Sequence, residues 1–195
     1  MRDAKVARKT AETDIKIELH LDGKGNSSIH TGIGFFDHML TGFAKHGFFD
    51  LKVDCKGDLN VDGHHTVEDV GIVLGNAIKE AAGDKKGMAR YGHFILPMDD
   101  ALVLCAIDFC GRPYLNFDME FDTDRCGYFE NDLVKEFFYA ISYTAGMNIH
   151  IKKLAGENAH HIIEATFKAF AKALDMATAK DSRCADVLST KGSLK

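Results

Sequence analysis

Two copies of the motif His-His-x-x-Glu are the parts of this 195-residue sequence best suited to chemistry. The first copy contains His64, His65 and Glu68, and the second contains His160, His161 and Glu164. A helix turns about 100° per residue, so the first histidine and the glutamate of each copy lie about 40° apart. The second histidine lies about 60° beyond the glutamate. Two imidazoles and a carboxylate then share one helix face, a donor set suited to manganese, iron or zinc.

His38 and Glu136 are further candidate ligands, because each lies in a predicted helix that precedes one copy of the motif. A lone histidine on an apolar helix is usually a core residue. A buried histidine and a buried glutamate at equivalent positions are each costly unless they are paired or metal-bound, which favours a ligand role. The histidines without a partner pattern are interpreted as structural or surface residues: His20, His30, His46, His93 and His150.

A small group of basic and hydroxyl residues could bind a phosphate group. Arg90 follows a lysine-containing loop, Arg112 follows a predicted strand, and Ser189, Thr190 and Lys191 lie near the C-terminus. Guanidinium, hydroxyl and ammonium groups form charge-assisted hydrogen bonds with a phosphate monoester. Taken singly, each charge fits a solvated surface position equally well, and the sequence alone does not bring these residues together.

The elements that must position these residues occur twice in the same order. Strand-like stretches that end in glycine turns cover 14–23 and 101–111, and helical spacing follows at 35–43 and 133–141. Alternating strands at 50–53 and 148–151 come next, and second helices over 70–78 and 167–174 follow the two motifs. Paired histidines also occur at helix caps and surfaces, but two copies at matching repeat positions favour metal binding.

We therefore predict an α+β fold of duplicated two-layer halves, each with a β-sheet covered by two helices. Residues 1–86 form the first α+β repeat and residues 87–195 the second, and the two together form one compact unit. The boundary lies in the turn 83–87. Two prolines and the lack of low-complexity sequence argue against a flexible linker.

Composition argues against nucleic-acid-binding, membrane and disulfide-rich proteins. A net charge of -5 without a long basic run argues against a nucleic-acid partner. The apolar runs are too short to span a bilayer and no signal peptide is evident, so we expect a cytoplasmic protein without a membrane partner. The 5 cysteines form no C-x-x-C pair, which predicts reduced thiols rather than a disulfide framework or a zinc knuckle.

Along essentially its whole length, the sequence resembles the imidazoleglycerol-phosphate dehydratase family. The stretches that carry this resemblance are 31–40, 62–69, 97–102, 111–115, 160–170 and 189–192. The resemblance implies a hydro-lyase of histidine biosynthesis that converts imidazole glycerol phosphate to imidazole acetol phosphate and water. It also implies two manganese ions per active site and a homo-oligomer of twenty-four chains with sites at subunit contacts.

The resemblance assigns roles residue by residue. The positions that match metal ligands are His38, His64, His65, Glu68, His160, His161 and Glu164, and His38 also lies among the substrate contacts. Arg90, Arg112, Ser189 and Lys191, with Thr190 between the last two, match the phosphate site, and Glu12 matches a substrate-contacting acid. Many relatives carry histidine where this chain has Glu136, and Asp-Gln where it has Thr41 and Gly42.

Glu12 is the candidate for moving the proton during dehydration, because ligation would occupy Glu68 and Glu164. We expect the substrate imidazole to bridge the two ions. A di-metal hydrolase acting on phosphate esters could use the same ligands and phosphate site, and it is the alternative function. The third hypothesis is a non-enzymatic module that binds metal or nucleic acid. The net negative charge and the absence of tryptophan argue against it.

Overall fold

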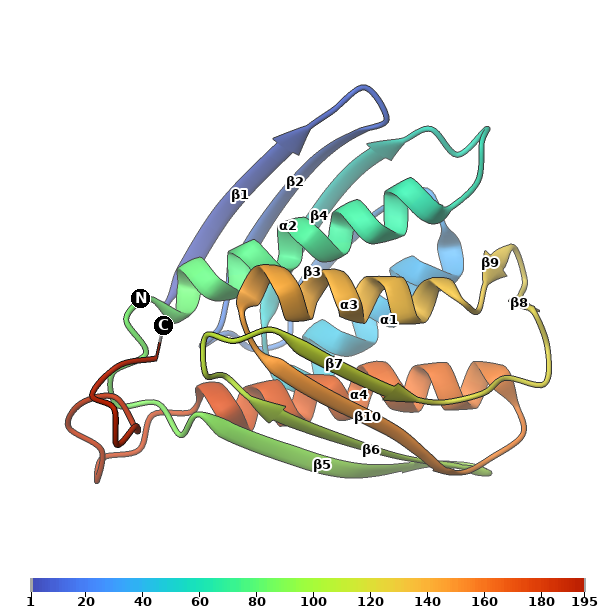
Figure 1. Ribbon diagram of the computed structural model, residues 1–195. Helices are drawn as coiled ribbons and strands as arrows, with labels where there is room; N and C mark the ends of the chain where they lie inside the picture. Colours follow the sequence, from blue (N-terminus) through green and yellow to red (C-terminus); the bar gives the residue numbers. More distant parts are fainter. Residues whose placement is uncertain (1, 195) are drawn as a thin grey trace.

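The computed structural model describes residues 2–194, and in this range its main strands form two four-stranded sheets. Figure 1 shows the sheets on opposite sides of the molecule with four helices between them. The strand order is β1-β2-β4-β3 in the first sheet and β5-β6-β10-β7 in the second. The same order in both sheets reflects the internal repeat.

The first half contains β1 (Asp3–Lys9), β2 (Thr13–His20), β3 (Ser27–His30), α1 (Gly34–Gly47), β4 (Asp50–Gly57) and α2 (His64–Ala82). On β2, alternate side chains point into the core, so that Ile15, Ile17 and Leu19 are buried. Helices α1 and α2 pack on this inner face. The residues between the buried ones are charged, and they form the outer face of the sheet.

The second half contains β5 (Tyr91–Met98), β6 (Ala101–Asp108), β7 (Tyr114–Asp118), β8 (Arg125–Cys126), β9 (Phe129–Glu130), α3 (Leu133–Ala145), β10 (Asn148–Ala155) and α4 (Ala159–Thr178). Its sheet is covered by α3 and α4, and α4 lies across β5 and β6. The small β8–β9 hairpin has no counterpart among the described elements of the first half.

Helices from opposite halves pack in pairs, α1 with α4 and α2 with α3. The α2–α3 contact is close because α2 carries Gly71 and Gly75, where an added Cβ would lie 2.9 Å from the Phe137 carbonyl oxygen and 2.0 Å from Thr144 Oγ1 respectively. Phe137 also stacks on Phe167 with ring centroids 5.1 Å apart. The two halves therefore share one core.

The structure confirms the predicted duplicated α+β fold and the order of its elements. Sequence patterning did not single out β1, β3, β5 and β7, which lie at the sheet edges. Edge strands carry weak patterns, as in β1, where only Ala4 is fully buried. The predicted turn at 83–87 does lie between α2 and β5, whereas the division into repeats at residue 86 remains an interpretation, and residues 1 and 195 lie outside the described range.

None of the helices within residues 2–194 is both long enough and apolar enough to cross a membrane. Cys55, Cys105 and Cys110 are buried free thiols of the core, and Cys126 and Cys184 are half-buried free thiols. Burial raises the pKa of the Cys55 thiol to about 12, so this group stays protonated and unreactive.

Candidate metal centre and phosphate-binding residues

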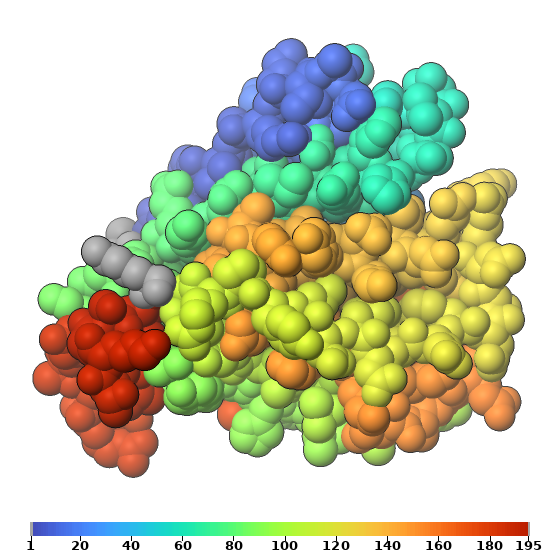
Figure 2. All heavy atoms as spheres, viewed as in Figure 1, coloured from blue at the N-terminus to red at the C-terminus, as the bar shows by residue number. Residues whose placement is uncertain are grey.

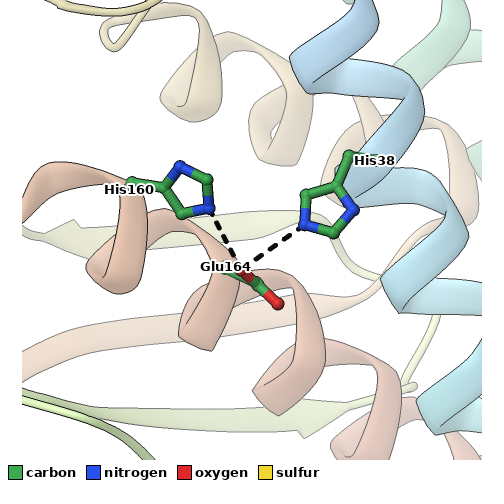
Figure 3. Close-up of side chains that lie close together, drawn as sticks. All are labelled: His38, His160 and Glu164. Atoms are coloured by element: carbon green, nitrogen blue, oxygen red, sulfur yellow. Dashed lines mark hydrogen bonds and ion pairs between the residues drawn. The ribbon is translucent and has the colours of Figure 1, made fainter.

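His38, His160 and Glu164 form a side-chain triad between α1 and α4 (Figure 3). The Glu164 carboxylate oxygen Oε2 lies 3.2 Å from His160 Nε2 and 3.5 Å from His38 Nε2. His160 and Glu164 share one face of the first turns of α4, and His38 faces them from α1. Two nitrogens and a carboxylate oxygen thus converge on one point, and their ligand atoms all lie within 4.8 Å of one another.

The second oxygen of Glu164 binds Lys168, one helical turn along α4, at 2.7 Å. Burial acts to raise the pKa of Glu164, but the hydrogen bond and charge of Lys168, with smaller contributions from His38 and His160, lower it below its ordinary value. The glutamate is therefore ionised at neutral pH and keeps one oxygen for the triad. The only sequence signal for Lys168 was its position four residues after Glu164, and the predicted site did not include this lysine.

The second histidine of each motif does not join this triad. His65 Nδ1 lies 3.0 Å from Asp58, and His161 Nδ1 lies 2.6 Å from Asp100. The hydrogen bond to Asp58 raises the pKa of His65. Hydrogen bonds from the backbone N–H groups of Asn158 and Glu157, and then from His161, hold the pKa of Asp100 well below its ordinary range.

The remaining predicted ligands, His64, Glu68 and Glu136, lie farther from one another in a single chain than the residues of the triad do. His64 Nε2 lies 3.8 Å from Glu68 Oε2 across one turn of α2. Glu136 lies in the first turn of α3, the helix that packs on α2. Within residues 2–194, these side chains do not converge as closely as the triad does.

Glu12 lies in the turn between β1 and β2, with Oε1 3.8 Å from His65 Nε2. A buried network on α2 holds this turn. The Asp69 carboxylate forms an ion pair with Arg8 of β1 and accepts a 2.5 Å hydrogen bond from Thr13 Oγ1 of β2. The turn that carries Glu12 is therefore fixed to the helix that carries His65.

Arg90, predicted to bind phosphate, is strongly held in place. Its guanidinium donates to both carboxylate oxygens of Asp108, at 2.7 and 3.1 Å, and to the carbonyl oxygen of Leu188 at 2.8 Å. The guanidinium also stacks on the Tyr91 ring, 4.7 Å from its centroid. Sequence analysis identified Arg90 but missed Asp108, because the ion pair forms only when β6 pairs with β5.

The bond to Leu188 brings the C-terminal tail to Arg90. There Ser189 Oγ accepts a hydrogen bond from the Lys191 backbone N–H at 3.2 Å, and Thr190 and Lys191 are exposed. Arg112 is exposed in the loop between β6 and β7, and its carbonyl oxygen accepts a 2.7 Å hydrogen bond from Asn148 Nδ2. The fold thus connects Arg90 with the tail, whereas no contact joins the Arg112 guanidinium to either within residues 2–194.

A cavity of about 1210 Å³ opens beside the triad, and His38 and His160 form part of its wall. Phe35 lines it as well and meets the His160 ring edge-on at a centroid distance of 5.1 Å. The β8–β9 hairpin closes another side. Figure 2 shows the segment that contains the β8–β9 hairpin in yellow at one edge of the molecule, at the opposite end from the red C-terminal tail.

The site and fold define a duplicated α+β protein with a histidine–carboxylate site able to chelate a metal. The family model for imidazoleglycerol-phosphate dehydratase matches residues 31–174. A dehydratase of that name from Lachnoclostridium phytofermentans is 63% identical over 194 residues, which cover 100% of this chain and 99% of the relative. One from Acetivibrio thermocellus is 60% identical, with 99% of each chain covered.

Solved structures agree with the sequence comparisons. The dehydratase from Pyrococcus furiosus, in complex with (S)-C348, has 42% identity and a TM-score of 0.84, covering 97% of this chain and 100% of that one. The enzyme from Staphylococcus aureus has 38% identity and the same TM-score, covering 92% and 99%. The chain belongs to the imidazoleglycerol-phosphate dehydratase family, and it is a hydro-lyase of histidine biosynthesis.

Proposed function

We propose that this chain converts imidazole glycerol phosphate to imidazole acetol phosphate and water at a centre of two manganese ions. The observation that carries this proposal is the triad of His38, His160 and Glu164. Ligand atoms bound to one metal at about 2.1 Å lie about 3 to 3.5 Å apart. The distances of 3.2 and 3.5 Å from Glu164 to the two imidazoles agree with that spacing. Nitrogen and hard oxygen donors suit manganese.

The internal repeat suggests the residues for a second ion. Helix α3 corresponds to α1, and α2 corresponds to α4, so Glu136 takes the place of His38. His64 and Glu68 then take the places of His160 and Glu164. We infer that Glu136, His64 and Glu68 hold the second ion, with an additional carboxylate in place of one imidazole.

His65 and His161 support a site shared between chains. Each is held through Nδ1, and neither reaches the triad of its own chain. Nε2 faces a carboxylate in each half, Glu12 at 3.8 Å from His65 and Asp99 at 3.6 Å from His161, so a metal ion at Nε2 would have a carboxylate nearby. We infer that each completes the coordination of an ion in a neighbouring chain, in a homo-oligomer of twenty-four subunits with the active sites at subunit contacts. Metal binding and assembly would then be thermodynamically linked.

The bound ions would supply Lewis acidity, which stabilises the charge that develops as the hydroxyl leaves. Glu12 is the residue for proton transfer, because it is exposed beside His65 and is not one of the ligands. Glu68 and Glu164 are weaker candidates for that role. Arg90, Arg112, Ser189, Thr190 and Lys191 would hold the substrate phosphate and keep the reacting carbon in position. The substrate of this step of histidine biosynthesis is a small phosphorylated metabolite, and we infer a cytoplasmic location for the reaction.

Removing and restoring the metal tests this proposal. The chelated full-length protein should lose ketone formation from imidazole glycerol phosphate and regain it best with manganese. His160→Ala should lose most activity, whereas His30→Ala, which changes an exposed histidine of β3, should not. Release of inorganic phosphate instead of the ketone would indicate the phosphate-ester hydrolase, and full turnover without metal would refute the metal centre.

Light scattering, recorded while manganese is removed and added back, tests whether the site is shared between chains. Metal removal should shift the protein from a large particle to smaller species, and manganese should restore size and activity together. A fully active monomer would contradict a site shared between chains.

A further inference from the structure

Two aspartates outside the proposed ligand set make the same contact in the two halves of the protein. Asp58 lies 3.0 Å from Nδ1 of His65, and Asp100 lies 2.6 Å from Nδ1 of His161. A carboxylate can only accept a hydrogen bond when it is ionised, so the imidazole must donate from Nδ1. In a neutral ring this places the proton on Nδ1 and the free lone pair on Nε2.

The backbone around each aspartate is itself fixed. The second oxygen of Asp100 accepts hydrogen bonds from the backbone N–H groups of Glu157 and Asn158, at 2.7 and 3.0 Å, just before α4 begins. The Asp58 N–H donates to the Glu12 carbonyl oxygen at 3.1 Å, and its own carbonyl accepts from Val61 at 2.8 Å. The carboxylate of Asp100 is therefore held directly, whereas for Asp58 it is the backbone position that is fixed.

The two contacts are not a simple result of the internal repeat. Asp58 follows β4, whereas Asp100 lies in the turn between β5 and β6. The equivalent turn of the first half carries Glu12, which faces Nε2 of His65 at 3.8 Å, as Asp99 faces Nε2 of His161 at 3.6 Å, and it supplies no partner to Nδ1. An aspartate from a different element in each half therefore accepts from Nδ1 of the equivalent histidine. This recurrence indicates that both histidines require a carboxylate at Nδ1.

We propose that Asp58 and Asp100 are positioning residues that hold the Nε2 lone pairs of His65 and His161 outward for a divalent metal. This inference rests on the proposed function, in which these two imidazoles are ligands. Carboxylates that accept from the distal nitrogen of a ligand histidine fix its tautomer and orientation and make it more basic. Their loss costs about 10- to 100-fold in metal affinity.

Manganese affinity of the full chain gives the first test. Asp58→Asn and Asp100→Asn should each weaken manganese binding by about 10- to 100-fold in calorimetric titrations of the metal-free protein. Asp118→Asn is the matched control, because Asp118 is an exposed strand aspartate that pairs with Lys152. Unchanged affinity in both test variants would overturn the proposal.

A double-mutant cycle separates positioning from mere support of the loop before α4. If Asp100 acts through His161, Asp100→Asn should have no further effect on manganese affinity in a His161→Ala background. An equal loss in both backgrounds would show that Asp100 only supports the backbone at Glu157 and Asn158, and would refute the positioning role.

The unsubstituted protein provides a test that does not depend on the folding of any variant. Solid-state NMR of the metal-free chain labelled with ¹⁵N-histidine should show His65 and His161 with the proton on Nδ1, and neutral rings protonated on Nε2 would overturn the proposal. These outcomes are distinct from failure of the proposed function. Activity without manganese would refute the metal centre, whereas manganese-dependent activity with unchanged affinity in both variants would refute only the role of the two aspartates.

Discussion

Arg90 and Asp108 form a bidentate ion pair in which both side chains are largely buried, with exposed fractions of 13% and 21%. Arg90 is a non-glycine residue with φ of 69°, a left-handed conformation that is sparsely populated for such residues. Backbone hydrogen bonds to Ala177 and Phe109 hold it there. The guanidinium is thus fixed before any phosphate arrives.

Asp108→Asn should weaken substrate binding while it leaves manganese affinity unchanged. The asparagine keeps the shape but loses the charged partner of Arg90, at a cost of about 1.5 kcal/mol, or about tenfold in kcat/KM. Most of the change should appear in KM, measured by steady-state kinetics. If instead kcat falls and KM does not change, Asp108 does not act through phosphate binding.

Deletion of residues after Leu188 should raise KM and lower kcat together. Ser189 follows Leu188, whose carbonyl accepts from Arg90, and Lys191 donates its backbone N–H to Ser189. Binding energy at a distant phosphate would hold the reacting carbon in position. A shorter deletion, after Gly192, removes none of the proposed phosphate contacts and serves as the control. If the longer deletion leaves kcat/KM unchanged, the tail does not take part in the site.

Lys168→Met should shift the loss of manganese in acid to higher pH. In the wild-type protein the pKa of Glu164 is lowered, so this carboxylate stays ionised and able to bind metal at and above its ordinary pKa. The substitution removes the charge that lowers the pKa, and burial then raises it. Manganese release should be followed as pH falls from 7 to 4, values that span the carboxylate and imidazole ranges at about 4.3 and 6.5.

Lys172→Met is the matched control for that experiment, since Lys172 pairs with Asp175 one turn further along α4. Its release curve should coincide with that of the wild type. An identical curve for Lys168→Met would show that Lys168 does not tune the triad.

Asp69→Ala should unfold the protein more easily and misplace Glu12. The substitution leaves the buried hydroxyl of Thr13 without its acceptor, and it leaves Arg8, whose side chain is 37% exposed, without its charged partner. The lost hydrogen bond to Thr13 and the partly screened ion pair together cost about 2 kcal/mol, which denaturant titration of the metal-free protein would detect. Thr166→Val, which removes a buried hydroxyl of α4 and keeps the size of the side chain, should cost less, about 1 kcal/mol. A loss for Asp69→Ala no greater than that of the control would contradict the proposed anchor.

The sequence alone determined the duplicated α+β order and the helices that carry both motifs. Periodicity is a local property, and each element buries the face that its own pattern defines, as Ile15 and Ile17 do on β2. It also identified His160 and Glu164 from the repeated motif, and His38 from its place on the preceding helix. The expected burial of His38 was wrong, because its side chain is 53% exposed on the surface of α1.

The tertiary structure decided which of these residues meet. His38 comes from the first half, and His160 and Glu164 come from the second, because the halves pack α1 against α4. Asp58, Asp100 and Asp108 meet their partners through contacts between elements of the same half, whereas Lys168 contacts Glu164 within α4. A long-range contact depends on how helices and sheets pack, and spacing along the chain carries little information about that packing. For this reason Arg90 could be predicted as a phosphate-binding residue, whereas its fixed position between Asp108 and the tail could not.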